Sequence, residues 1–379
     1  MALVLNDEQN MLKESAKGFL QENAPVEALR ALRDEGDAVG FSRDLWQQMV
    51  DMGWSGILVD ESYGGLSFGH VGMGQVMEEN GRTLSASPLL STAVLAVSAI
   101  SLAGNEAQKS TLLPAIVAGE LVMTVAVDSG SRHNPSQVGL TASIDGSGFS
   151  LNGEKQFVID GHVADKVIVS ARTSGVEGES EGITLYMLDT DTPGVEIERV
   201  IMADSINSAQ IRFTDVKVGA DAILGELDQG YGVLGQVLDI GNAHLCAELV
   251  GVAQEVLERT VAYMNERSQY GALIGSYQSL QHRAAHLFTQ VALAKSVVLN
   301  LLQALDKGSE DVAMLASLTK AKVGEVVTLA TNEGVQLHGG IGMTDELEIG
   351  FFMKRARVAE QLLGDQRFHI NRFAAIKGF

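Results

Sequence analysis

The sequence predicts an α+β protein with an N-terminal helical domain (residues 1–120), a central antiparallel β-barrel or sandwich (residues 121–228) and a C-terminal four-helix bundle (residues 229–379). Apolar residues recur at helical spacing in the first and last thirds, whereas short segments separated by glycines fill the middle. With 46% hydrophobic residues and five prolines in 379 positions, the composition is that of a helix-rich globular chain too long for one ordinary core.

The first third reads as helical throughout. Asn6 and Gln9 make a capping-box pattern, so we expect a first helix that runs to about Glu22 and is ended by Pro25. Helical patterns also cover residues 43–52, 71–80, 88–102 and 112–118.

The middle third reads as strands. The dipeptide Asn152-Gly153 is the strongest short hairpin signal in the chain, so we expect a tight turn there. The expected strands are residues 121–127, 140–144, 149–152, 155–159, 167–171, 183–188, 195–200, 209–213 and 216–218.

Helical patterning returns near Gly230 and predicts helices over residues 281–306, 311–337 and 347–362. Before them, a helix beginning near residue 238 repeats apolar residues every three or four positions, which predicts one buried face. These apolar residues are Leu245, Leu249, Val252, Val256 and Val261. Glu248 interrupts the pattern among small and apolar neighbours, where a charge is costly unless it is paired, protonated or used, so Glu248 is a candidate site residue.

Charge and cysteine content exclude several classes of protein. The formal charge of -21, with no run of Lys or Arg, argues against a nucleic-acid partner. The single cysteine, Cys246, excludes an intrachain disulfide framework and favours a reducing, cytoplasmic location. We expect no membrane insertion, since no signal-peptide pattern precedes Asn6 and no unbroken apolar run is long enough to cross a bilayer.

Two C-terminal motifs carry a resemblance to a known family. They read RSQYGALIGSYQSLQHRAAHL (residues 267–287) and QLHGGIGMTDELEIGFFMKRARVAEQLLG (residues 336–364). Together with DESYGG from Asp60 and LNGEKQFVIDGHVAD from Leu151, they make nearly the whole chain resemble the acyl-CoA dehydrogenase family. The resemblance implies FAD as cofactor, an acyl-CoA substrate and an electron-transfer flavoprotein as electron acceptor. It also implies a homo- or hetero-oligomer, dimer or tetramer, in which a partner subunit completes the cofactor site.

The resemblance assigns cofactor-binding roles to six residues, and no metal ligand. Arg267 would bind the FAD diphosphate through its permanently charged guanidinium, although a helix-end salt bridge is the alternative for Arg267 alone. The others are Tyr270 and Gln278 on the adenylate side, and Gln336, Gly339 and Gly340, where the backbone would approach the cofactor. A helix C-cap is a second role open to the two glycines.

On the β-domain side the chain departs from the family pattern. In this resemblance, Val127 and Ile159 stand where family members carry threonines that bind the flavin ring. The ring would then rely on backbone N–H groups and on Ser129, Ser131 or His133. Arg132 and His133 could bind the CoA phosphates, or they could be an exposed pair on a loop.

The catalytic base departs as well. Gly241 and Leu363 occupy the two positions where family members place the base, a glutamate. Glu248, two helical turns beyond Gly241, and Asp365, two residues beyond Leu363, are the replacements we consider, with Glu248 preferred. The alternatives are an ion pair from Glu248 to an Arg or His of a neighbouring helix, and a cap by Asp365 on a terminal helix near Arg367.

The resulting hypothesis is an acyl-CoA dehydrogenase that forms a 2,3-enoyl-CoA and holds the thioester carbonyl by a backbone N–H near Leu363 or Gly364. Small residues at Gly235, Gly241 and Ala243 leave room for a bulky acyl group such as a steroid side chain. The second hypothesis is a flavin-poor, non-catalytic subunit of a heteromeric dehydrogenase. A third is a monooxygenase on the same scaffold, which would need no carboxylate base.

Overall fold

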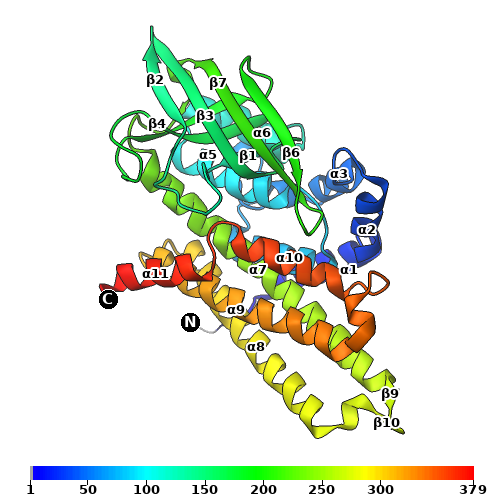
Figure 1. The fold of residues 1–379 in the computed structure, drawn as a ribbon. Helices are drawn as coiled ribbons and strands as arrows, with labels where there is room; N and C mark the ends of the chain where they lie inside the picture. Colours follow the sequence, from blue (N-terminus) through cyan, green and yellow to red (C-terminus); the bar gives the residue numbers. More distant parts are fainter. Residues whose placement is uncertain (1–2) are drawn as a thin grey trace. The chain divides into compact units, whose positions relative to one another are not determined.

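The computed structural model describes residues 3–379, and their contacts divide into two compact units. The sheet unit comprises residues 36–69 and 86–241, and the helical unit comprises His70–Ser85, Asn242–Phe379 and the N-terminal residues up to Glu35. Along the chain, the predicted order of helices, sheet and helices is confirmed (Figure 1).

The first helix begins where a capping residue satisfies a backbone N–H group. The predicted capping box is confirmed, since Asn6 and Gln9 exchange side-chain to backbone hydrogen bonds at the start of α1 (Asp7–Asn23). Helix α2 (Val26–Glu35) was not predicted, because Pro25 indicated only the end of α1, whereas proline also suits a helix start. In the sheet unit the helices are α3 (Arg43–Asp51), the π-helix η3 (Leu89–Ala96), α5 (Val97–Ala103) and α6 (Glu106–Val117).

The sheet has the strand order β6-β7-β3-β2-β4-β5-β8, with β1 paired to β4. Its strands are β1 (Met123–Ala126), β2 (Thr141–Asp145), β3 (Gly148–Ile159), β4 (Lys166–Arg172), β5 (Ile183–Asp189), β6 (Val195–Ile201), β7 (Asn207–Val218) and β8 (Ile223–Leu224). Pairing is antiparallel apart from β1 with β4 and β2 with β4, which are parallel. Alternation within single strands does not reveal such parallel neighbours.

The predicted turn at Asn152-Gly153 is wrong. Strand β3 continues through both residues, and its register with β7 shifts between Leu151 and Gly153, which is a β-bulge. Gly153 is needed there because its φ is +138° and a Cβ would lie 2.9 Å from the Cα of Leu140. The tight turn of this region instead joins β2 to β3, where Asp145 pairs with Gly148.

The helical unit is built on long helices. They are α4 (Gly69–Thr83), α7 (Gly230–Glu266, of which the part from Asn242 belongs to this unit), α8 (Gln278–Asp306), α9 (Val312–His338), α10 (Ile349–Gln361) and α11 (Gln366–Lys377). Helix α9 packs against α8, α10 and α11 (Figure 1). Helices α4 and α7 approach at backbone distance, because a Cβ on Gly81 would overlap the carbonyl of Glu248, and a Cβ on Gly251 would overlap that of Glu78.

The prediction of a single buried face on α7 is wrong for the middle of this helix. All residues from 242 to 253 are buried, whereas Val261 is 38% exposed. Apolar residues on several sides therefore mark a helix surrounded by others, and every polar residue among them needs a partner.

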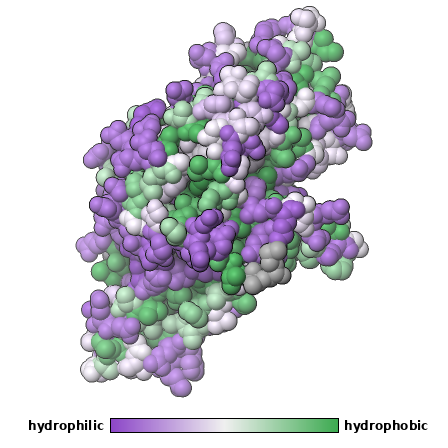
Figure 2. All heavy atoms as spheres, turned by 180° about the vertical axis from the view of Figure 1, so that it is seen from behind, coloured by the Kyte–Doolittle hydropathy of each residue, from purple (hydrophilic) through white to green (hydrophobic). Residues whose placement is uncertain are grey.

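Hydrophilic residues cover much of the face drawn in Figure 2, and hydrophobic residues lie between them. Among residues 3–379, α8 is the one helix whose length and hydropathy would permit a membrane span. Helix α8 packs along α9, and core helices of soluble proteins pass the same test.

We expect Gly251→Ala to lower the free energy of unfolding by roughly 1–3 kcal/mol, because its Cβ would push α4 away from α7. Gly235→Ala on the same helix is the matched control, since no atom lies within 4 Å of its added Cβ and alanine is the better helix former. Urea unfolding of both variants checks this, and equal midpoints would contradict the close approach.

Candidate functional site

The first of the two C-terminal motifs forms a small hairpin after α7. Strands β9 (Ser268–Gln269) and β10 (Ala272–Leu273) pair through a turn in which Tyr270 and Gly271 have φ of +52° and +81°. Two successive positive φ angles are those of a type I′ turn, which a glycine at the second position favours. Arg267 precedes the hairpin, and its carbonyl accepts a 2.8 Å hydrogen bond from Ile274.

A small core brings the second motif to this hairpin. Met264 at the end of α7, Ile274 after the hairpin and Leu337 at the end of α9 form one buried cluster. Next to it the rings of Tyr263 and His338 stack with centroids 4.5 Å apart. The end of α7 and the end of α9, which are far apart in sequence, therefore meet at one end of the helical unit.

All six residues assigned to the cofactor are solvent-accessible at this end, either exposed or on an open backbone. Tyr270 is 97% exposed, and Arg267, which is also exposed, makes no ion pair with any residue from 3 to 379. Gln278 at the start of α8 and Gln336 in α9 are exposed too. Gly339, with φ of +65°, is the C-cap of α9, so that alternative holds, and a Cβ on Gly339 or on Gly340 would meet no atom within 4 Å. The backbone of these two glycines therefore faces open space.

Glu248 lies in the interior of the helical unit with a partner. Its Oε1 accepts a 2.6 Å hydrogen bond from Nε of Arg355 on α10, and both side chains are almost fully buried, with exposed fractions of 4% and 6%. The alternative considered for Glu248, an ion pair to an arginine of a neighbouring helix, is thus present. The carboxylate is held in place from the opposite helix.

Asp365 is the N-cap of α11. Its Oδ1 accepts a 2.7 Å hydrogen bond from the backbone N–H of Phe368, which is the capping role left open by the sequence. Neither candidate base is therefore without a structural contact.

The turn between α10 and α11 carries the other customary base position. Leu363 is buried, and its φ of +57° is rare for a branched apolar side chain. The N–H of Gly364 donates to the carbonyl of Gln361 at 3.3 Å, whereas the N–H of Leu363 has no acceptor among residues 3–379.

In the sheet unit, Val127 and Ile159 each accept a hydrogen bond through the backbone carbonyl. The carbonyl of Val127 accepts a 2.6 Å hydrogen bond from Nζ of Lys155, whose burial lowers its pKa to about 7. The carbonyl of Ile159 accepts a 2.6 Å hydrogen bond from Oγ1 of Thr124. His133 is not an exposed loop residue, since its Nδ1 lies 3.0 Å from Oδ2 of Asp128 and its side chain is 5% exposed.

A histidine pair in the helical unit was missed by the sequence analysis. Nδ1 of His70 lies 3.1 Å from Nε2 of the fully buried His244. Burial lowers the pKa of both imidazoles, and the nearby carboxylate of Asp306 opposes this effect at His70. The available signal was His244 itself, a polar residue one turn before Glu248 in an apolar helix.

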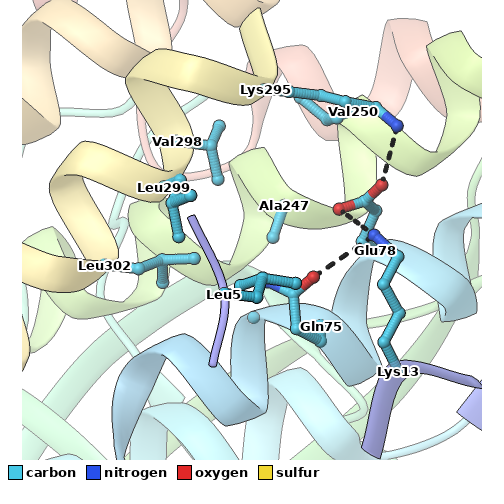
Figure 3. Close-up of a pocket in the computed structure, with 11 residues that line it drawn as sticks. Leu5, Lys13, Gln75, Glu78, Ala247, Val250, Lys295, Val298, Leu299 and Leu302 are labelled. Carbon is cyan, nitrogen blue, oxygen red and sulfur yellow. Dashed lines mark hydrogen bonds and ion pairs between the residues drawn. The ribbon is translucent and has the colours of Figure 1, made fainter. Parts of the chain in front are cut away.

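A cavity of about 150 Å³ lies between α4, α7 and α8 (Figure 3). Its walls are apolar, and its polar side is Glu78, which pairs with Lys13 at 2.9 Å and Lys295 at 3.1 Å. The two ammonium groups lower the pKa of Glu78 despite its burial. Lys13 also lies 3.8 Å from Glu79, so two carboxylates and two ammonium groups from three helices face one another, and we assign the cluster to helix packing.

The whole chain matches the models of one family. The N-terminal domain of acyl-CoA dehydrogenases matches residues 6–120, the middle domain residues 126–216 and the C-terminal domain residues 228–376. The mitochondrial isovaleryl-CoA dehydrogenase of Pongo abelii is 30% identical over 94% of this chain and 85% of its own length. The caffeyl-CoA reductase-Etf complex subunit CarC of Acetobacterium woodii is 26% identical over 94% of each chain. A solved structure of a Tcur3481-Tcur3483 steroid ACAD variant is similar with a TM-score of 0.88, 26% identity and 98% of each chain covered.

We expect Arg355→Met to lower the free energy of unfolding by roughly 3–5 kcal/mol, because it leaves the Glu248 carboxylate buried without its cation. The double variant Glu248→Leu, Arg355→Met should recover most of that loss. Arg212→Met, which removes an exposed ion pair to Glu196, is the control and should change little. Chemical unfolding measures all three, and an Arg355→Met variant as stable as the control would contradict the ion pair.

The histidine pair predicts a loss of stability in acid. Because the folded-state pKa of His70 and His244 lies below the unfolded value of about 6.5, the unfolded chain binds more protons as pH falls below that value. Stability should be complete above about pH 6.5 and then fall by up to roughly 1.4 kcal/mol per pH unit for each histidine. Unfolding of His244→Asn between pH 8 and 5 should show a shallower slope than wild type. The exposed His286→Asn should keep the wild-type slope.

Proposed function

The chain belongs to the acyl-CoA dehydrogenase family, and we propose that it is a FAD-dependent enzyme that oxidises an acyl-CoA thioester to the 2,3-enoyl-CoA. The observation that carries this proposal is the meeting of the Arg267 hairpin and the end of α9 across one shared core. That meeting gathers exposed polar groups and an open glycine backbone at one end of the helical unit.

The residues of this end fit a dinucleotide. Arg267 would bind the diphosphate, because its side chain is exposed and a guanidinium forms forked hydrogen bonds with phosphate oxygens. Tyr270 and Gln278 would contact the adenylate side, while Gln336, Gly339 and Gly340 would let the backbone come close. When bound, FAD supplies the hydride acceptor for the β-carbon of the substrate.

The turn after α10 would hold the thioester. Of the two backbone N–H groups considered, that of Leu363 is the better donor, since the N–H of Gly364 already donates to Gln361. A hydrogen bond to the thioester oxygen stabilises the negative charge that develops there when the α-proton leaves. The turn would therefore raise the acidity of the substrate.

We propose Glu248 as the proton acceptor, with Asp365 as the second candidate. To take a proton, Glu248 would have to turn away from Arg355, so the ion pair restrains its use. Asp365 would have to leave the N-terminus of α11. Each carboxylate can act only if its structural contact opens.

Because both carboxylates already make structural contacts, a second function is also favoured. In it, the chain is a non-catalytic subunit whose cofactor-binding residues complete the site of a partner subunit that has its own catalytic base. In that arrangement Gly241 and Leu363 need no acidic replacement. The similar steroid ACAD variant carries the double designation Tcur3481-Tcur3483, which agrees with a partner that is not identical.

We further propose a cytoplasmic location, an oligomer, an electron-transfer flavoprotein as acceptor and a bulky, steroid-type acyl group. The thiol of Cys246 is fully buried and burial raises its pKa to about 12, so it is an apolar packing residue suited to a reducing compartment. The relative that is a subunit of an Etf complex supports the acceptor. Open space at Gly235 supports the bulky substrate.

The test is the visible spectrum of the purified chain, followed by dye-coupled oxidation of a panel of short, branched and steroid-type acyl-CoA thioesters. Bound flavin with turnover is expected, and Glu248→Gln should reduce turnover by roughly 10²–10⁴ as for loss of a general base. Asp365→Asn is the matched variant. Asparagine caps a helix as well as aspartate does but cannot accept the proton, so this variant keeps the helix cap and removes the candidate base.

Turnover retained in both variants would remove both carboxylates from the mechanism. A wild-type chain without flavin or turnover, which gains both when mixed with a partner dehydrogenase subunit, would establish the second function instead.

A further inference from the structure

The turn of Leu363 and Gly364 is held in a costly conformation. Leu363 has a φ of +57°, and Gly364 has a φ of +103°, where a Cβ would lie 2.6 Å from Phe368 and 2.8 Å from Nε2 of His369. A branched apolar residue persists in the left-handed region only when its surroundings over-determine the backbone. The turn must therefore be fixed by contacts stronger than its own preference.

Three buried side chains from three helices supply those contacts. Nζ of Lys320 on α9 donates to the carbonyl of Leu362 and lies 3.3 Å from Oδ1 of Asn242 on α7. The Nδ2 group of Asn242 donates to the carbonyl of Leu363 at 3.2 Å, and Nε2 of His369 on α11 lies 3.0 Å from the same oxygen. Because a carbonyl only accepts, His369 must carry its proton on Nε2. We call Lys320, Asn242 and His369 the turn clamp.

Lys320 is the costliest member of the turn clamp. It is fully buried, and burial lowers its pKa to about 8. Burying an ammonium group is unfavourable unless its hydrogen bonds are made, and Lys320 donates to the carbonyl of Leu362 at this turn and to Asn242 of the turn clamp. A methionine would fill similar space without that cost, so the amine is there for the carbonyl of Leu362.

We propose that Lys320 is a positioning residue which, with Asn242 and His369, fixes the backbone of Leu363 so that its N–H points at the thioester carbonyl. This inference rests on the proposed function, because it concerns the same substrate oxygen. It adds that affinity for the carbonyl is set by side chains that never touch the substrate.

The test compares the affinity of the purified, FAD-supplemented chain for an acyl-CoA thioester and for the S-alkyl-CoA thioether of equal length, which lacks the carbonyl. Calorimetric titration of wild type should favour the thioester. In Lys320→Met and in Asn242→Leu that preference should fall about tenfold, as for loss of one well-placed hydrogen bond. His369→Gln retains a donor and should keep most of the preference.

Lys322→Met is the matched control, since Lys322 lies two residues further along α9 and contacts Gln290 at 2.8 Å and Glu325 at 3.2 Å instead. If folded Lys320→Met and Asn242→Leu variants keep the wild-type preference, the inference is overturned while the proposed function stands. If wild type binds both analogues equally, or neither, the proposed thioester site fails and the inference fails with it. Should Lys320→Met not fold, Asn242→Leu decides alone.

Discussion

The buried middle of α7 carries three polar side chains, and each of them must find a partner because burial of an unpaired polar group is unfavourable. Asn242 meets the turn after α10, His244 meets His70 at the start of α4, and Glu248 meets Arg355 on α10. These partners lie in different directions around one helix. The positions of α4, α10 and the turn around α7 are therefore fixed by polar complementarity as well as by apolar packing.

Close packing makes those polar contacts possible. Gly81 and Gly251 let α4 and α7 approach at backbone distance, and Glu78 on α4 pairs with lysines on α1 and α8. Larger residues would separate the helices and leave the polar groups too far apart to pair. Buried Glu78 and Glu248 thus each have a basic partner, in a chain whose formal charge is -21.

Local signals predicted the elements better than they predicted the contacts. Asn6 with Gln9 fixed a helix start, because a capping box acts between neighbours in sequence. Two local signals gave wrong predictions. Pro25 suits the start of a helix as well as the end of one. Asn152-Gly153 suits a β-bulge as well as a hairpin turn, and only the pairing of this segment with β7 distinguishes the two. For the site, the sequence proposed Glu248 because its charge lies among apolar residues. It proposed the six cofactor residues from the family motifs, and Asp365 from its place two residues beyond Leu363. It could not pair Glu248 with Arg355, because 107 positions separate them and several arginines were available.

In the proposed function, the turn after α10 keeps one part of the reaction, the binding of the thioester oxygen, without the other, the removal of the proton. A base at position 363 would need an acidic side chain, whereas a donor for the thioester oxygen needs only the backbone, and the backbone is what Lys320, Asn242 and His369 hold. A leucine is strained at a φ of +57°, and its side chain has no polar group that could take part in the reaction. If the turn served only to connect two helices, a glycine or asparagine would relieve that strain. In the proposed function, substrate binding and proton removal are thus separable tasks, and the conformation of this turn serves the first of them.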